Sequence, residues 1–271
     1  MIYVRSLRLS GEGRRNPNLY PYNVFGSRRG EQMIFEPVTL LYGNNGSGKS
    51  TVLNLLANLL GIQGSEQMTF YCQSYFEKYQ RECVLGFGED EYGNPISAPP
   101  KRSRYIKSED ILYEVKKVER EAVLEEELEY QQKLQEKAGK KTLKKGSLEW
   151  MERMEILAFA QEKYSNGETA MRLFDDFLCP DALFLLDEPE TSLSPANQVK
   201  LAETINQMAR LLDCQFIIAS HSPFLLGTLT AKIYNLDRPG LVTCPWTQLE
   251  NIRYFYDFFQ THRKEFDGTK P

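Results

Sequence analysis

The stretch that decides the fold is residues 38–51, which read Val-Thr-Leu-Leu-Tyr-Gly-Asn-Asn-Gly-Ser-Gly-Lys-Ser-Thr. Its first five residues have the pattern of a buried strand, and residues 50–60 then carry apolar side chains at helical spacing. The glycines between them let backbone N–H groups turn inward, and the helix adds the positive end of its dipole. Strand, loop and helix therefore predict a phosphate-binding loop. We expect its residues to be Gly43, Asn44, Asn45, Gly46, Ser47, Gly48, Lys49, Ser50 and Thr51.

Two side chains of this loop carry chemistry. The loop matches Gly-x4-Gly-Lys-Ser, in which Lys49 can reach the β- and γ-phosphates of a nucleotide and the Ser50 hydroxyl can ligate Mg²⁺. The alternative is a Gly- and Asn-rich turn before a helix, with no ligand.

Two adjacent carboxylates follow a second buried strand. Residues 182–186 are continuously apolar, and Asp187 and Glu188 come directly after them. In a parallel sheet both carboxylates emerge at the edge that faces the phosphate loop. We expect Asp187 to hold Mg²⁺ through water and Glu188 to polarise an attacking water as general base. The alternative is an acidic strand end that begins a turn, because Pro189 follows.

One of the two histidines follows a third buried strand, at residues 215–220, within Ser-His-Ser-Pro. There the imidazole of His221 could touch both the γ-phosphate and Glu188. A lone histidine after a strand is more often structural. Only its place in the ordered set of motifs favours the functional interpretation.

A fourth string, Tyr-Ser-Asn-Gly-Glu at residues 164–168, precedes a helical pattern at residues 169–178. Ser165 and the amides near Gly167 would cap this helix and present an anion site. In isolation, the string is simply a helix N-cap with an acidic first turn.

Composition sets the broad class. The chain of 271 residues is 41% hydrophobic and 26% charged, as in soluble globular proteins. Its net charge of −4 argues against a global basic field that would draw it onto nucleic acid. No apolar run approaches the ~20 residues that span a bilayer, and the five cysteines form no Cys-x-x-Cys pair. We expect a cytoplasmic protein with reduced thiols, no signal peptide and no transmembrane segment.

Alternating strands and helices predict an α/β fold with a mostly parallel sheet. Residues 104–107 and 231–236 have strand patterns, and residues 196–212 form an amphipathic helix that begins at Ser194-Pro195. Residues 86–95 and 98–102 are rich in turn formers and predict exposed loops.

Residues 111–163 predict a helical insertion within a single domain that spans residues 1–271. A basic cluster within it could contact the phosphate backbone of DNA, or could be a solvated loop. Its lysines are Lys140, Lys141, Lys144 and Lys145.

In this order the strings resemble the ABC-type ATPase superfamily of P-loop NTPases. Walker A corresponds to residues 43–51, the signature to 164–168, Walker B to 183–188, the D-loop to 191–195 and the switch histidine to His221. Leu-Leu-Asp-Glu-Pro-Glu, together with Ala-Ser-His-Ser-Pro, looks closest to stand-alone bacterial ATPases labelled AAA family, akin to the RecF, SMC and overcoming-lysogenization-defect groups.

Residues 2–9 and 33–35 have strand patterns, and we expect N-terminal antiparallel strands ahead of the parallel sheet. The resemblance implies ATP and Mg²⁺ as cofactors. It also implies an ATP-dependent homodimer that sandwiches two ATP molecules. Ser165, Asn166 and Gly167 of one subunit would then contact the nucleotide held by the other.

The chain departs from the superfamily pattern at several positions. Asn166 replaces a glycine of the usual signature, Glu168 brings a negative charge near a phosphate, and Ser194 stands where transporters have an aspartate. The Q-loop residue is open between Gln73 and the 107–109 segment. The adenine-stacking aromatic is open among Tyr20, Tyr22 and Phe25.

These features predict an ATP hydrolase whose ATP-bound dimer switches a partner, either an effector protein or DNA, in DNA maintenance or anti-phage defence. One alternative is a nucleotide-dependent interaction or sensor module with negligible turnover. Another is the ATPase subunit of a transport complex. A kinase or small GTPase is disfavoured, because no guanine-specifying Asn-Lys-x-Asp string occurs.

Overall fold

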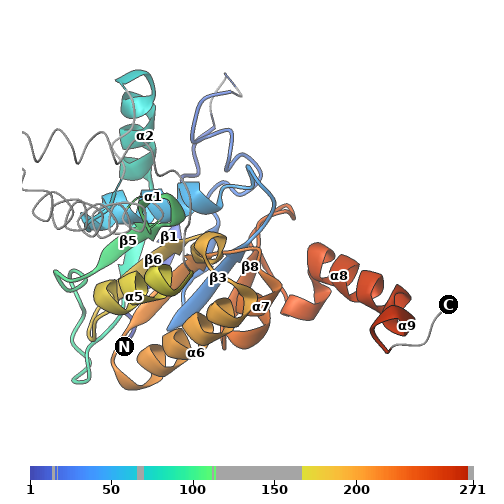
Figure 1. Cartoon of the computed structure of the whole chain (residues 1–271). Helices are drawn as coiled ribbons and strands as arrows, with labels where there is room; N and C mark the ends of the chain where they lie inside the picture. The colour runs from blue at the N-terminus through green and yellow to red at the C-terminus, as the bar shows by residue number, and fades with distance from the viewer. Residues whose placement is uncertain (14–15, 17, 66–69, 112, 114–166, 268–271) are drawn as a thin grey trace, which may run out of the picture. The chain divides into compact units, whose positions relative to one another are not determined.

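We describe the chain from a computed structural model, which places residues 1–13, 16, 18–65, 70–111, 113 and 167–267 (Figure 1). The chain forms two compact units, one of Met1–Ser108 with Phe177–Pro271 and one of Glu109–Asp176. Of the expected insertion at residues 111–163, only residues 111 and 113 are described, so its helices stay a prediction.

The elements are as follows. The strands are β1 (Val4–Arg8), β2 (Gln32–Ile34), β3 (Val38–Tyr42), β4 (Val84–Phe87), β5 (Arg104–Lys107), β6 (Leu183–Asp187), β7 (Gln215–Ala219), β8 (Lys232–Asn235) and β9 (Val242–Thr243). The helices are α1 (Lys49–Leu60), α2 (Phe70–Glu82), α5 (Gly167–Phe177), α6 (Pro195–Leu211), α7 (Pro223–Thr228), α8 (Glu250–Thr261) and α9 (Arg263–Phe266). Two 3-10 turns are η1 (Pro189–Ser192) and η2 (Trp246–Gln248).

The main sheet has the order β5-β6-β7-β3-β8-β9, and its first five strands are parallel. Only β9 runs antiparallel, to β8. A second sheet, β2-β1-β4, is antiparallel. The prediction of an α/β fold with a mostly parallel sheet and N-terminal antiparallel strands is confirmed.

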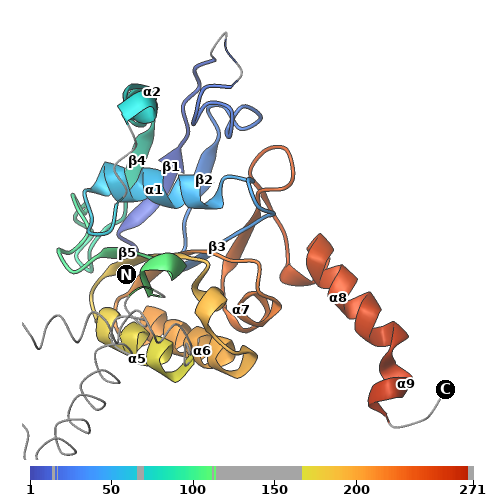
Figure 2. The same cartoon turned by 45° about the horizontal axis from the view of Figure 1, so that its top comes forward.

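The continuous apolar pattern of β6 and β7 follows from burial on both faces. Figure 2 shows α1 and α6 on opposite faces of the main sheet. Leu183 and Leu185 point into the core that α1 shares with the antiparallel sheet. On the other face, Phe184 stacks on Phe216 with ring centroids 5.3 Å apart. The strands that carry the candidate site residues are thus held rigidly in the core.

Several elements lie where the sequence predicted none; they are α2, β4, α7, β9, α8 and α9. In α2, Tyr79 is buried and its ring packs edge-on against Tyr22 at 4.9 Å. These tertiary contacts stabilise a helix whose composition is otherwise polar. In β4, Gly86 and Phe87 were expected in a turn, and that prediction is wrong. A side-chain carbon at Gly86 would clash with the Ser6 hydroxyl of β1, so the glycine allows close strand pairing.

The C-terminal elements α8 and α9 follow the last strand. In both views they lie clear of the two sheets, and the first turn of α8 joins them to the rest of the unit (Figures 1 and 2). Among the described residues, no helix is long and apolar enough to cross a membrane. The four cysteines whose side chains are described are free thiols.

Candidate active site

The parallel order β6-β7-β3 brings three strand ends to one edge of the main sheet. Asp187 of β6 is in register with Ala219 of β7, and Ala219 pairs with Leu41 of β3. The phosphate loop, the Asp187–Glu188 pair and His221 all follow directly after these positions. The motifs that are far apart in the sequence therefore meet at the carboxyl ends of neighbouring strands, as expected for an open α/β sheet.

The phosphate loop has the backbone that its glycines were expected to permit. Gly46 and Gly48 have φ angles of +83° and +101°, a region that other residues rarely adopt. A side-chain carbon at Gly48 would also come within 2.6 Å of Val24 Cγ1. Gly48 caps α1 without a side-chain hydrogen bond, so the first-turn N–H groups of α1 are not capped by a side chain. Such a loop can receive a phosphate.

Lys49 lies within this loop rather than outside it. Its side chain is 5% exposed, and its Nζ donates hydrogen bonds to the carbonyls of Gly43 at 2.8 Å and Asn44 at 3.4 Å. Glu188 Oε1 lies 3.4 Å from the same Nζ. The Lys49 ammonium group is therefore held inside the phosphate loop, where it would contact a bound phosphate.

Two residues from the C-terminal part of the chain also hold the phosphate loop in place, and neither was assigned from the sequence. Asp237, just after β8, accepts a 2.7 Å hydrogen bond from the backbone N–H of Asn44. Asn251 of α8 donates to the side-chain oxygen of Asn44 at 3.4 Å. No local pattern marks either residue, because both contacts join segments about 200 positions apart.

Asp187 is buried and has one free oxygen. Its Oδ2 accepts a 3.0 Å hydrogen bond from the hydroxyl of Tyr105 on β5. Its buried Oδ1 has no hydrogen-bond partner in the described part of the chain. Burial raises the pKa of Asp187 above its ordinary value, and the hydroxyls of Ser50 and Tyr105 partly offset that rise.

This donor set fits Mg²⁺. The ion prefers oxygen ligands and usually takes only one or two carboxylates from the protein. An unpartnered carboxylate oxygen of Asp187 beside the Ser50 hydroxyl meets that requirement. In the ranges that the structure places, no group of three or more His, Cys, Asp or Glu side chains could hold a metal ion.

Glu188 occupies an unusual backbone conformation. Its φ of +48° and ψ of +51° lie in the left-handed region, which costs a non-glycine residue on the order of 1 kcal/mol. Two contacts hold it there: its N–H donates to the Ala219 carbonyl at 2.9 Å, and its carbonyl accepts from the Thr191 hydroxyl at 3.0 Å. Strain of this kind is commonly found at functional sites.

The carboxylate of Glu188 lies between two cationic or titratable groups. Its Oε1 is 3.4 Å from Lys49 Nζ and 3.7 Å from His221 Nδ1. The Glu188 side chain is 30% exposed and that of His221 50% exposed, so a substrate can reach both. The structure thus brings together Lys49, Asp187, Glu188 and His221. Their roles in chemistry stay predictions.

A second glutamate, Glu190, holds the His221 turn and was not assigned from the sequence. Its Oε1 accepts three hydrogen bonds, from the Ser220 hydroxyl at 2.7 Å and from the backbone N–H groups of His221 at 3.0 Å and Ser222 at 3.2 Å. The same oxygen is 3.7 Å from His221 Nδ1. The available signal was its place two residues after Glu188 in the Leu-Leu-Asp-Glu-Pro-Glu string.

The signature residues are not tested by this geometry. Ser165 and Asn166 lie outside the described residues, and Gly167 is described only as the first backbone position of α5. In the D-loop segment, Ser194 caps α6 as expected, since its side chain accepts the backbone N–H of Asn197.

The structure bears on two assignments that the sequence left open, the adenine-stacking aromatic and the Q-loop residue. Tyr22 and Phe25 are buried against Tyr79, whereas Tyr20 is half-buried and its hydroxyl donates to Thr51 of the phosphate loop at 3.3 Å. The Tyr20 ring also stacks on Phe76, with centroids 6.1 Å apart, and which of the three aromatics meets adenine stays a prediction. Of the Q-loop candidates, Lys107 lies beside Asp187 in the parallel register of β5 and β6, and the assignment of the Q-loop stays a prediction.

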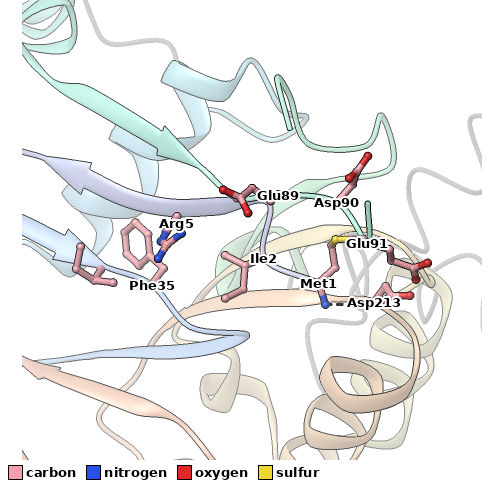
Figure 3. A pocket seen from close by; sticks show the side chains of 10 residues that line it. Met1, Ile2, Arg5, Phe35, Glu89, Asp90, Glu91 and Asp213 are labelled. Carbon is pink, nitrogen blue, oxygen red and sulfur yellow. Dashed lines mark hydrogen bonds and ion pairs between the residues drawn. The ribbon is translucent and has the colours of Figure 1, made fainter. Parts of the chain in front are cut away.

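A separate cavity of about 490 Å³ lies away from this edge (Figure 3). It is lined by Met1, Arg5 and several carboxylates, among them Asp213 just before β7 begins. The N-terminal amino group pairs with Asp213 at 3.3 Å, as Figure 3 shows. The cavity is therefore at the amino end of β7, whereas His221 follows the carboxyl end, and it takes no part in the site.

With the geometry in place, comparison with known proteins identifies the family. The family model described as "AAA domain, putative AbiEii toxin, Type IV TA system" matches residues 88–227, just over half of the chain. The chain belongs to this AAA family. It is an ATPase nucleotide-binding domain of the ABC type, as the ordered motifs predicted.

Two curated relatives are similar to this AAA protein. A "Putative ABC transporter ATP-binding protein" of Sulfurisphaera tokodaii is 25% identical over 209 residues, which cover 76% of this chain and 38% of that protein. The tungstate uptake system ATP-binding protein TupC of Campylobacter jejuni is 25% identical over 239 residues, which cover 82% of this chain and 64% of that protein. The AAA protein thus spans less than two thirds of the length of either relative.

Among solved structures, the Smc head domain of Pyrococcus furiosus, bound to the C-terminal domain of ScpA, is similar with a TM-score of 0.49. The two chains are 13% identical, and the similarity covers 97% of this chain and 100% of that chain.

Proposed function

We propose that this AAA domain binds ATP with Mg²⁺ at the carboxyl ends of β3, β6 and β7 and hydrolyses it. The observation that carries the proposal is the position of the Glu188 carboxylate, 3.4 Å from Lys49 Nζ and 3.7 Å from His221 Nδ1 at the phosphate loop. A carboxylate beside a γ-phosphate site, flanked by a cation and an imidazole, is suited to orient and deprotonate an attacking water.

Each residue then has one task. The loop amides of residues 43–51 hold the phosphates, and Lys49 exchanges its two loop carbonyls and Glu188 for the β- and γ-phosphate oxygens. Asp187 and Ser50 would hold Mg²⁺, which when bound neutralises charge on the phosphate oxygens. Glu188 accepts the proton of the attacking water. His221, positioned by Glu190, contacts the γ-phosphate and keeps Glu188 oriented.

We further propose that two copies close on ATP, with Ser165, Asn166 and Gly167 of one copy contacting the nucleotide of the other. A phosphate bridged by two subunits favours the closed pair, and hydrolysis releases it. The pair would switch an effector protein or DNA in the cytoplasm. The family description, which names a toxin of a toxin–antitoxin system, favours defence within this proposal.

The test compares the wild type with Glu188→Gln. Removing the general base should lower turnover by about 10²–10⁴-fold, because a positioned base contributes that much. ATP binding should persist, and the variant should accumulate as an ATP-bound dimer. Equal turnover in both proteins would refute hydrolysis by Glu188. Negligible turnover in both proteins would support the alternative of a nucleotide sensor.

A second candidate is the ATPase subunit of a transport complex, which the names of the two relatives favour. ATPase assays with and without DNA separate it from the first. Severalfold stimulation by DNA supports a DNA partner. A flat response, together with co-purification of a membrane protein, supports transport.

A further inference from the structure

Six aromatic side chains on α8 and α9 are exposed to solvent. We call them the aromatic surface; they are Tyr254, Phe255, Tyr256, Phe258, Phe259 and Phe266, and 42% to 73% of each side chain is exposed. Within α8, only Ile252 is buried. The apolar face of an amphipathic helix is normally covered by other protein.

Three of the six rings contact one another in a row. Phe258 and Phe259 contact edge to face at 5.7 Å, and Phe259 contacts Phe266 of α9 at 5.9 Å. The charged residues of α8 are confined to the other side, where Arg253 pairs with Asp257 at 3.5 Å. One side of α8 is therefore polar. The rings on the remainder stay largely exposed, although the Arg253 guanidinium lies 5.0 Å from the centre of the Tyr256 ring and His262 packs against Phe258 at 4.6 Å.

The area of this surface matches that of an interface. At ~200 Å² for each aromatic side chain, the exposed fractions amount to roughly 600–700 Å². The largest apolar patch on a typical monomer is ~300–600 Å². A stable interface takes ~800 Å² from each partner. The aromatic surface thus exceeds what a monomer usually exposes and supplies most of one side of a stable contact.

The charge of the region selects the kind of partner. Between residues 250 and 267 there are three cationic side chains and four anionic ones, so the formal net charge is −1. Anionic membranes and nucleic acid both select basic surfaces, which this region lacks. The complement of a nearly neutral aromatic helix is another nearly neutral aromatic helix, which a second copy of the chain supplies.

We propose that the aromatic surface is the interface between two copies of this chain, with α8 of one copy packed against α8 of its partner about a two-fold axis. Such an interface is self-complementary, because each ring of one copy meets the same array on the other. The contact needs no nucleotide, since none of its residues belongs to the phosphate loop.

This pairing would matter for the proposed ATPase cycle, and that consequence rests on the proposed function. The first turn of α8 is bonded to the loop region, because the Asn251 N–H donates to the Tyr42 hydroxyl at 3.3 Å and its side chain donates to Asn44. A pair held through α8 keeps two phosphate loops in one particle. ATP-driven closure then becomes intramolecular and faster than between free monomers.

The test measures molar mass in solution without nucleotide, by light scattering at micromolar concentration. The wild type should have twice the 31.4 kDa of one chain. Phe255→Glu with Phe259→Glu should be monomeric, because burying two carboxylates in an aromatic interface weakens association by more than about 100-fold. A control, Gln260→Glu, adds one charge on the side of Arg253, seven residues earlier, and should stay dimeric.

Further variants keep the outcomes distinct. Lys49→Ala should remain dimeric, so a failure of ATP binding does not affect this result. Tyr254→Glu gives a second, independent disruption, and circular dichroism checks that every variant is folded. A monomeric wild type, or a dimer that survives both disruptions, overturns the proposal. So does a monomer that co-floats with phosphatidylcholine–phosphatidylserine vesicles, since α8 would then bind membrane.

Discussion

The two ends of the main sheet differ in how well their buried polar atoms are hydrogen-bonded. At the amino end, the Gln215 side chain accepts hydrogen bonds from the backbone N–H groups of Tyr3 and Val4 at 2.9 Å and donates to the Val4 carbonyl. At the carboxyl end, Asp187 Oδ1 and Glu190 Oε2 are buried without a partner among the described residues. Unsatisfied buried groups cost stability, so a protein keeps them where a ligand or reaction needs them. The satisfied end holds the fold, and the unsatisfied end is the candidate site.

The largest expected difference comes from substituting one aspartate by asparagine at each end of the sheet. Asp187→Asn should lower ATP hydrolysis by about 10³-fold, because it removes the proposed carboxylate ligand of Mg²⁺. Asp181→Asn changes a carboxylate that accepts the Tyr3 hydroxyl at 2.6 Å near the amino end, and should leave turnover unchanged. Steady-state kinetics of both purified variants measures this. Equal losses would remove the distinction between the two ends.

The same Asp187→Asn variant should be more stable than the wild type when nucleotide and Mg²⁺ are absent. Burial raises the pKa of Asp187, so its ionised form opposes folding at neutral pH. The gain in melting temperature should fade below about pH 4, where an unfolded-state aspartate is itself protonated. A lower melting temperature for the variant at pH 7 would contradict this account.

The converse prediction concerns the amino end. Gln215→Ala should lower the free energy of unfolding by about 2–4 kcal/mol, because two buried N–H groups lose their acceptor. Urea denaturation measures the loss. The kcat of the folded variant should stay near that of the wild type, and a large fall in kcat would show that the two ends are coupled.

The smallest expected effect is at Glu190. Glu190→Gln keeps an acceptor oxygen for the His221 turn and should lower kcat by about 10-fold with little change in the KM for ATP. Glu190→Ala removes the acceptor and should cost more in kcat. If both variants shift KM rather than kcat, Glu190 supports ATP binding instead of positioning His221.

The parts of the fold with strong local patterns were predictable. The strand before the phosphate loop, helix α1 with Gly61 in left-handed conformation at its C-cap, and buried strands β6 and β7 appear where the periodicity placed them. These segments combine continuous apolar runs with glycine or proline at their ends. Helix α2 and strand β4 were missed, because aromatic packing and a close strand pairing stabilise them.

The residues of the candidate site likewise include some that the sequence identified and some that it did not. Lys49, Asp187, Glu188 and His221 were identified from the order of their motifs, and the structure places them together. Tyr105, Glu190 and Asp237 were not identified. Each acts through a contact with a residue on another strand or loop, and no spacing within a single segment encodes such a contact.

The sequence alone determined which chemical groups this protein has and in what order they occur, because loop, strand and helix patterns are local properties of the chain. Only the tertiary structure decided which of those groups meet. The parallel register sets Asp187 beside Ala219 and Lys107, and burial leaves Asp187 with one unpartnered oxygen. It also decided that the rings of α8 face solvent, since exposure depends on what the remainder of the chain covers.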